Sequence, residues 1–135
     1  MLILLSTDIC RHLIREQDEA LLSALQSWSA GNDEILISSI TYAELVAGAM
    51  LTKEQARHMQ LVKAFCERLD DIVAWDAEAV DAYSDIQMTA MQEGYSLNMN
   101  DAMLAAHALA LNAQLLTLSS HHFEKIAGLK LKLWA

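Results

Sequence analysis

The chain has 135 residues, of which 54% are hydrophobic, with no proline and four glycines. That length suits one domain with its own core, and the composition predicts dense regular structure with short connections. The formal charge of −9, from 9 basic and 18 acidic residues, counts against a protein that binds nucleic acid through a broad basic face. A local basic patch, a divalent metal or a basic partner chain stays compatible with it.

The first half of the chain alternates short apolar runs with amphipathic segments. The apolar run 2–5 predicts a buried strand, followed by helices over 8–17 and 17–28, a loop over 29–34 and a strand over 35–37. Ser38, Ser39 or Thr41 can cap a helix over 42–50. The segment 53–69 predicts a long amphipathic helix.

The second half continues the alternation. It predicts a strand over 72–75, a helix over 77–94 capped by Asp76 and closed by Gly94, and an apolar helix over 100–112. A strand over 113–118, a short helical turn over 121–129 and an edge strand over 129–134 follow. This order predicts an α/β fold, a three-layer α/β/α sandwich with a mainly parallel central sheet of about five strands, in a single domain 1–135.

The cysteines and the N-terminus bear on the compartment. Cys10 and Cys66 have apolar neighbours and match no metal-binding spacing, so we expect buried free thiols in a reducing compartment. The N-terminal apolar run has no basic flank and is too short for a signal peptide or a membrane span. We therefore expect a cytoplasmic protein without a membrane segment.

Three acidic residues fall where parallel sheets bind ligands, beyond the carboxyl ends of strands. Asp8 follows the first predicted strand, Glu44 lies early in the helix after the second, and Asp101 opens the helix before the fourth. Two carboxylates about 5 Å apart repel by roughly 3 kcal/mol at an effective dielectric constant of 20, and Mg²⁺ or Mn²⁺ removes that cost. Helix capping and an exposed helix face explain the same residues without a ligand, so spacing alone predicts only a candidate acidic site.

Two long segments and the terminal tryptophan resemble a PIN domain, specifically a VapC-type toxin of a toxin–antitoxin pair. The segments are SSITYAELVAGA and GYSLNMNDAMLAAHALALNAQLLTLSSHHFEKIAGL, and the resemblance runs from the first strand to the C-terminus. It implies that Glu44, in the T-x-x-E-L motif, and Asp101, in the N-D-x-x-[IL]-A-A-H-A motif, are metal-site acids. His107 is the family's helix histidine, which we expect to pack or hydrogen-bond in the core.

The first-strand motif departs from the family pattern. The family usually reads L-D-T-N, whereas residues 5–8 read LSTD, so Ser6 replaces the leading acid and Asp8 takes the asparagine position. Because residues i and i+2 of a strand share a face, we expect Asp8 to reach the same pocket from further along the strand. Ser119 stands where the family has Asp or Asn after the fourth strand, and Gln87 where it has Arg. These changes predict a weaker metal site.

The resemblance implies a Mg²⁺- or Mn²⁺-dependent endoribonuclease. Asp8, Glu44 and Asp101 are expected to hold the metal, which activates the attacking water. The side chains expected to position water or phosphate are Ser6, Asn100, Ser119 and Ser120. The expected partners are RNA (tRNA for some relatives), a cognate antitoxin bound across helices such as 17–28 and 53–69, and a second copy of the chain in a homodimer.

Two other hypotheses stay open on the sequence. A PIN fold without two of its acids can bind an antitoxin or RNA without cutting, and Ser6, Ser119 and the negative charge favour that hypothesis over a generic toxin. An unrelated α/β protein is disfavoured by the long NDAMLAAHALALNAQLLT match. His121 and His122 are interpreted as surface polar residues, because adjacent side chains on a turn diverge.

Overall fold

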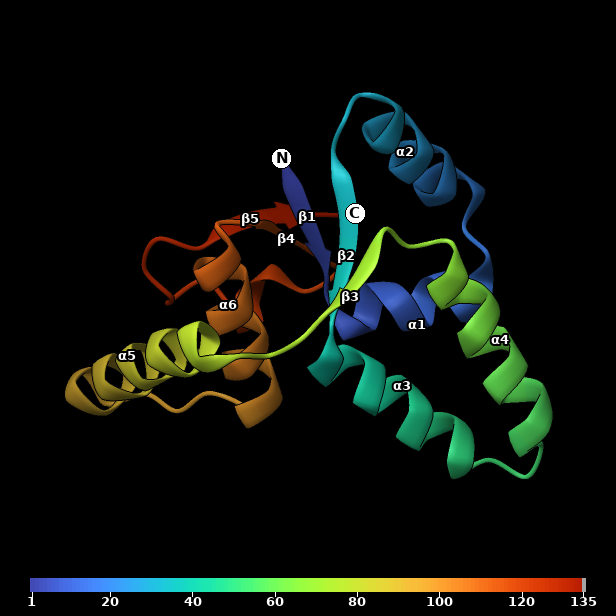
Figure 1. The fold of residues 1–135 in the computed structure, drawn as a ribbon. Coiled ribbons are helices and arrows are strands. Elements are labelled where there is room, and N and C mark those ends of the chain that lie inside the picture. The colour runs from blue at the N-terminus through green and yellow to red at the C-terminus, as the bar shows by residue number, and fades with distance from the viewer. Residues whose placement is uncertain (135) are drawn as a thin grey trace.

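The computed structural model describes residues 1–134, and all the predicted strands and long helices are present in it (Figure 1). The strands are β1 (Leu2–Leu5), β2 (Glu34–Ser38), β3 (Asp71–Val73), β4 (Gln114–Thr117) and β5 (Lys130–Leu133). The helices are α1 (Thr7–Glu16), α2 (Glu19–Ala30), α3 (Ser39–Met50), α4 (Gln55–Glu67), α5 (Ala77–Glu93), α6 (Met99–Leu111) and the short 3₁₀ helix η1 (Ser120–His122).

The five strands form one parallel sheet in the order β3-β2-β1-β4-β5. The strand β1 lies at the centre, with Leu4 opposite Leu36 of β2 and Leu115 of β4. The chain moves to one side of β1 to reach β2 and to the other side to reach β4, so the sheet has a topological switch point between β1 and β4. Ligands bind at such points in open α/β sheets, outside the carboxyl ends of the strands.

Helices cover both faces of the sheet, as the predicted three-layer α/β/α sandwich requires (Figure 1). Alternate side chains of β1 point to opposite faces: Ile3 and Leu5 enter one core with α1 to α4, and Leu4 enters the other with α5 and α6. The central strands β2, β1 and β4 are therefore apolar on both sides, which explains their unbroken hydrophobic runs.

The predicted helix boundaries agree with capping geometry at several ends. Ser38, one of three candidates, caps α3 by accepting a hydrogen bond from the Ile40 backbone N–H at 3.1 Å. Asp76 caps α5 through the Ala79 N–H, and Gly94 ends that helix in the left-handed conformation at φ 75°. Such backbone geometry suits glycine because it has no Cβ.

Three expectations need correction. The third strand ends at Val73, before Trp75, and the expected helical turn over 121–129 is a single 3₁₀ turn that begins at Ser120. Cys10 is fully buried, but Cys66 is only partly so; both are free thiols whose pKa values burial raises.

Within residues 1–134, no helix is both long enough and apolar enough to cross a membrane.

Candidate functional site

The end of β1 lies at the switch point of the sheet, and it positions the first acidic residue. The Ser6 backbone N–H donates a hydrogen bond to the Leu116 carbonyl of β4 at 2.9 Å, which ties this turn to the neighbouring strand. Asp8 then lies in the first turn of α1, near the helix N-terminus, where a negative charge is favoured.

The expected reason for the proximity of Ser6 and Asp8 is wrong, although the two side chains do meet. The strand ends at Leu5, and Ser6 is the N-cap of α1, so Asp8 is helical and does not extend along the strand. The Ser6 hydroxyl donates a hydrogen bond to Asp8 Oδ1, and the Ile9 N–H donates to the same oxygen at 2.8 Å. Thr117 Oγ1, at the end of β4, donates to Asp8 Oδ2 at 3.3 Å.

Glu44 reaches the same turn from α3. Its Oε1 accepts a hydrogen bond from the Thr7 hydroxyl at 2.8 Å, and Thr7 Oγ1 lies 3.0 Å from Thr41 Oγ1. Thr7 and Thr41 are buried, whereas Glu44 is half-buried, so its carboxylate points toward α1 and not outward to bulk solvent. Because Thr7 precedes Asp8 directly, this bond brings the second acid beside the first.

Asp101 approaches from the first turn of α6. Asn98 caps that helix, and its side-chain oxygen accepts hydrogen bonds from the backbone N–H groups of Asn100 and Asp101 at 3.0 and 3.2 Å. Burial raises the pKa of Asp101; His122 opposes that shift, while the carboxylates of Glu44 and Asp8 add to it. Glu44 and Asp8 are therefore near enough to Asp101, at one edge of the sheet, to act on its carboxyl group electrostatically.

The other predicted site residues contribute unevenly. Asn100 is exposed, and its side chain makes no hydrogen bond to any residue from 1 to 134. Ser119 is half-buried and donates its backbone N–H to Thr117 Oγ1 at 3.0 Å. Ser120 is also half-buried and begins η1. The Ser119 backbone N–H thus orients the Thr117 hydroxyl, which in turn donates to the Asp8 carboxylate.

His107 is a core residue, as expected. Its ring is 1% exposed, and Nδ1 lies 2.8 Å from the hydroxyl of Ser38, the cap of α3. Burial lowers the pKa of His107, and Asp76 and the Ala74 carbonyl oppose that shift. His107 therefore links α6, which carries Asp101, to α3, which carries Glu44.

Sequence reasoning underrated two groups in the site. Thr7 has no role predicted from the sequence, yet its hydroxyl donates to Glu44 and lies against that of Thr41; its place directly after the first strand was the available signal. His122 is exposed, as expected, but its Nδ1 also lies 3.5 Å from Asp101 Oδ2, and its ring meets that of His121 edge-on, so the two side chains do not diverge. Only the position of α6 beside η1 reveals that pairing.

The acidic residues fit a hydrated hard cation better than an enclosed one. Within residues 1–134, no group of three or more His, Cys, Asp or Glu side chains stands close enough to hold a metal ion directly. Mg²⁺ commonly keeps several waters and uses only one or two carboxylates, and oxygen donors suit it. Burial is the largest cause of the raised pKa of Asp101, and the nearby carboxylates of Glu44 and Asp8 add to it. The donor set therefore fits Mg²⁺ or Mn²⁺ bound partly through water.

Comparison with known proteins decides the family. The family model described as "PIN domain" matches residues 3–129, which is nearly the whole chain. The chain belongs to the PIN domain family. That membership agrees with the parallel sheet and with acids gathered from α1, α3 and α6.

Individual relatives match along their full length. The chain is 31% identical to ribonuclease VapC2 of Rickettsia felis over 134 residues, covering 99% of this chain and 98% of that protein. It is 26% identical to the tRNA(fMet)-specific endonuclease VapC of Shigella flexneri, covering 98% and 97%. The crystal structure of VapBC2 from Rickettsia felis bound to a promoter DNA fragment matches with a TM-score of 0.94 at 31% identity, covering 100% of both chains.

Proposed function

We propose that this protein is an endoribonuclease of the VapC toxin type that depends on Mg²⁺ or Mn²⁺. One arrangement supports the proposal above all others. Thr117, at the end of β4, donates a hydrogen bond to Asp8, and Thr7, the residue before Asp8, donates one to Glu44 of α3. These two bonds bring the acids of α1 and α3 together at the ends of β1 and β4. Asp101 joins them from α6. The ribonuclease relatives, matched from end to end, supply the reaction class.

The chain's own residues hold and orient the acidic groups. Ser6 donates to Asp8 Oδ1 and Thr117 donates to Asp8 Oδ2, which orients that carboxylate, while Thr7 fixes Oε1 of Glu44 and leaves its other oxygen outside that bond. Asp8, Glu44 and Asp101 are the residues that would hold the ion. When bound, Mg²⁺ or Mn²⁺ lowers the pKa of a nearby water and shields charge developing on the phosphate. Asn100 and Ser119 lie at the same edge and position the phosphate or the water.

A weakened or inactive PIN domain that only binds an antitoxin or RNA is the second candidate function. Two observations favour it: Ser6 supplies a hydroxyl where the family has an acid, and no three candidate ligands within residues 1–134 are poised to chelate an ion. Both predict a low affinity for metal. The two candidates differ in whether RNA is cut at saturating metal.

The antitoxin partner is assigned to an apolar groove between α1, α2 and α4. The hollow there has a volume of about 280 Å³ and is lined by Leu13, Leu22, Leu25, Gln26, Ser29, Ile35, Phe65, Arg68 and Leu69. Apolar grooves of this kind accept an amphipathic segment of a partner. The matched structures from Rickettsia felis and Haemophilus influenzae are of VapBC, and the antitoxin proposed here is a partner of that kind. The helices 17–28 and 53–69 predicted from sequence form much of this groove.

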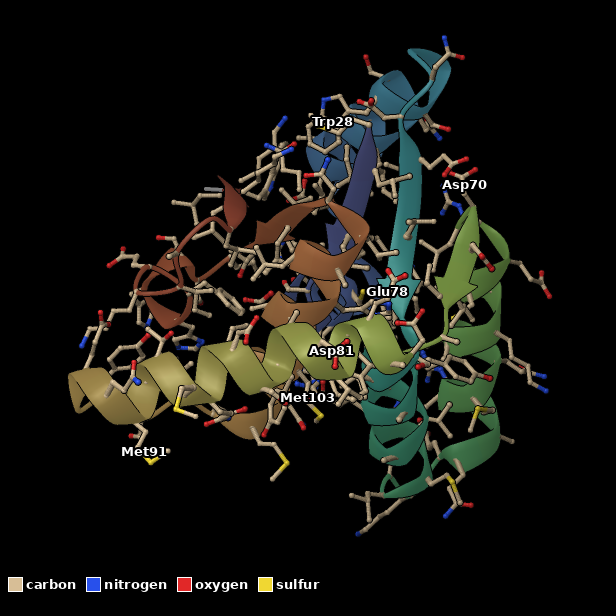
Figure 2. The ribbon with its side chains drawn as sticks, turned by 60° about the vertical axis from the view of Figure 1, so that its left-hand side comes forward. Trp28, Asp70, Glu78, Asp81, Met91 and Met103 are labelled. Atoms are coloured by element: carbon tan, nitrogen blue, oxygen red, sulfur yellow. The ribbon has the colours of Figure 1, made fainter. Side chains whose placement is uncertain are left out.

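A homodimer in the cytoplasm is part of the same proposal. Figure 2 shows Met91 near the far end of α5, projecting away from the fold. The side chains of Met88, Met91 and Met99 are 53%, 72% and 62% exposed, so this end of the α5–α6 pair offers apolar surface to a second copy. Sedimentation of the wild type and of Met91→Lys tests the assignment: the variant is expected to shift toward monomer, and an unchanged dimer would place the interface elsewhere.

RNA cleavage under controlled metal conditions tests the central proposal. The wild type is expected to cut a panel of labelled RNAs, tRNA included, with Mn²⁺ or Mg²⁺ and not in EDTA. Asp101→Asn and Glu44→Gln are expected to lose at least about a hundredfold in rate, because each removes a carboxylate from the reacting centre. If the wild type and both variants leave every RNA intact at saturating Mn²⁺, the second candidate replaces the first.

A further inference from the structure

A second groove, between α1, α3 and α4, combines basic side chains with one wall of the acidic site. Its volume is about 400 Å³. We call it the cationic groove after the four basic residues in its lining, Arg11, Arg15, Arg57 and His58; the rest are Ile14, Gln17, Glu44, Leu45, Gly48, Ala49, Thr52, Leu61 and Val62. Figure 1 shows its three helices together on one face of the sheet, opposite α5 and α6.

The positive charge of the groove is largely uncompensated. Arg11 and Arg15 lie four residues apart on α1, so they share one helix face, and neither forms an ion pair with a side chain in residues 1–134. Arg57 lies 3.5 Å from Glu54, but both side chains are more than 60% exposed, and such a pair is weak. Three of the nine Lys and Arg residues of an acidic chain thus face one hollow.

The groove opens directly onto the acidic site. Glu44 lines the groove and also accepts the hydrogen bond from Thr7, the residue before Asp8. Helix α1 carries Asp8 in its first turn and Arg11 one turn further on. A bound strand can therefore pass from the acids to the guanidinium groups along a single helix.

We propose that the cationic groove binds phosphates of a single RNA strand next to the bond cut at the acidic site. The inference rests on the proposed function, because it assigns the path of that substrate. An acidic site on an acidic protein repels a polyanion, so nearby fixed positive charges are needed to hold it. Guanidinium groups bind phosphate oxygens with paired N–H donors.

The lining also indicates which part of the RNA is bound. No Phe, Tyr or Trp of residues 1–134 lines the groove, so apart from His58 and the guanidinium planes it offers no platform on which bases can stack. Contacts are then to the backbone, which makes them tolerant of sequence. The groove fixes the strand and its register, and it leaves base choice to other contacts.

The charge distribution favours RNA over a protein segment as the occupant. The apolar hollow between α1, α2 and α4 has Arg68 as its one basic lining residue among those the structure describes, whereas the cationic groove has three arginines. A third, smaller hollow joins the two surfaces. It shares Ile14, Gln17 and Leu61 with the cationic groove, and it shares Leu13, Leu22, Phe65 and Arg68 with the apolar one. A partner in the apolar hollow can thus reach across and displace RNA.

Salt-dependent binding of RNA tests the inference apart from catalysis. The probe is a fluorescent 12-nucleotide single-stranded RNA of mixed sequence, titrated in EDTA at several salt concentrations with wild type, the single variants R11Q, R15Q and R57Q, and the triple variant. Each phosphate contact contributes about 0.7 to the slope of log K against log salt for single strands. The triple variant is therefore expected to lose about 2 in slope and at least roughly tenfold in affinity near 0.1 M salt.

Lys63 provides the matched control, because it is exposed on α4, the helix of Arg57, and lies outside the groove lining. K63Q removes the same charge and is expected to keep the wild-type slope. With metal present, the arginine variants are expected to raise KM and leave kcat unchanged. Thermal unfolding by circular dichroism confirms that these surface variants fold.

The outcomes separate this inference from the proposed function. If K63Q and the arginine variants lose equal slope, or if the wild type binds no RNA at low salt, the cationic groove is not an RNA site. If the arginine variants bind RNA normally but lose the antitoxin, the groove belongs to a protein partner and the inference fails. Arginine-dependent RNA binding without any cleavage by the wild type upholds the groove and overturns the ribonuclease proposal.

Discussion

Ser6 carries the largest departure from the family at the scale of single residues. Its hydroxyl caps α1 and donates to Asp8 at the place where the family has its leading acid. The substitution removes one negative charge from the pocket and keeps the carboxylate of Asp8 oriented. Ser6 is 3% exposed, so a carboxylate introduced there has little access to water unless a cation accompanies it.

Replacing Ser6 by Asp is expected to tighten Mn²⁺ binding by roughly tenfold or more, since added carboxylate charge strengthens a hard-cation site. The same change is expected to lower the unfolding temperature in EDTA, because a further acid then crowds Asp8. Calorimetric titration with Mn²⁺ and thermal unfolding in EDTA give the two readings. Ser6→Asn is the control of similar size without charge; equal Mn²⁺ affinity in both variants would remove Ser6 from the site.

Asp101 gives the site a pH dependence. Its pKa is raised by burial and by Glu44 and Asp8, so the folded protein binds that proton more tightly than the unfolded chain does. The stability from the protonated form is present at low pH and is lost as the pH rises through the raised pKa. Ionised Asp101 therefore opposes folding of the metal-free protein at neutral pH.

Asp101→Asn is accordingly expected to raise the free energy of unfolding in EDTA near pH 7, with a gain that shrinks as the pH falls toward the usual Asp pKa of about 3.9. Urea unfolding across that range measures the difference. Mg²⁺ is expected to reverse the order by stabilising only the wild type, by about 1.4 kcal/mol at ten times Kd. If the difference in unfolding free energy between the two proteins does not change with pH, ionisation of Asp101 does not destabilise the folded protein.

Sequence patterns reached the acids but not their hydrogen-bond partners. Asp8, Glu44 and Asp101 stood out because they fall beyond the carboxyl ends of strands, where parallel sheets bind ligands. Glu44 stood out further because a carboxylate within an otherwise apolar helix is costly. The bonds from Thr7 to Glu44 and from Thr117 to Asp8 join residues 37 and 109 positions apart, so only the packed fold reveals them. The reach of Asp8 was also misjudged, because the exact end of β1 depends on the cap that Ser6 forms.

At the scale of elements, the junction of β2 and α3 fixes the relative placement of two acids. Ser38 ends β2, caps α3 and meets His107 of α6 at 2.8 Å. The following turn is tied as well: Ser39 Oγ accepts from the Trp75 backbone N–H, and Trp75 Nε1 donates to the Met103 carbonyl of α6. The start of α3 and the middle of α6 are thus held by paired polar contacts inside the core.

Ser38→Ala removes a helix cap and leaves the buried His107 Nδ1 unpaired. The expected loss in unfolding free energy is about 2 kcal/mol, within the range of a lost cap together with an unmet buried polar group. Urea denaturation measures it, with Ser23→Ala on the exposed side of α2 as control. Because α3 then shifts against α6, Mn²⁺ affinity is expected to fall as well. A loss equal to that of the control would show that the contact stabilises nothing.

Element prediction succeeded because local signals agree with the fold. Apolar runs bounded by capping residues marked β1 and β2, and Gly94 marked the end of α5 through its left-handed backbone. The pattern failed near Trp75, whose apolar character looks strand-like while its backbone N–H bonds to a side chain of α3 and not to a strand. Single-turn elements such as η1 leave too few residues for a period to show.

Over the whole molecule, two grooves on one face of the sheet differ in the side chains that line them: one is mainly apolar and the other carries several basic residues. The apolar groove runs between α1, α2 and α4, and the cationic groove runs between α1, α3 and α4 beside the acids. Both use α1, so a partner in one groove and RNA in the other share an element. This arrangement accounts for how an acidic chain can receive both a protein and a polyanion on the same side.

Leu22→Arg is expected to abolish capture of a small basic antitoxin encoded next to the gene, because it places a charge in the apolar groove. Ser23→Arg, on the exposed side of the same helix, is expected to keep it. Copurification of the tagged proteins provides the measurement, and RNA cleavage by both variants should equal the wild type. If Leu22→Arg retains the antitoxin as well as Ser23→Arg does, that groove is not the docking surface.

Calorimetric titration of the metal-free protein with Mn²⁺ measures whether Asp8, Glu44 and Asp101 share one hard cation. Saturable binding is expected at or below roughly 1 mM, as for a weakened oxygen site. Glu44→Gln, which keeps an oxygen for Thr7, and Asp101→Asn are both predicted to abolish that binding. Absence of binding by the wild type at millimolar Mn²⁺, or binding that both variants retain, would contradict the account.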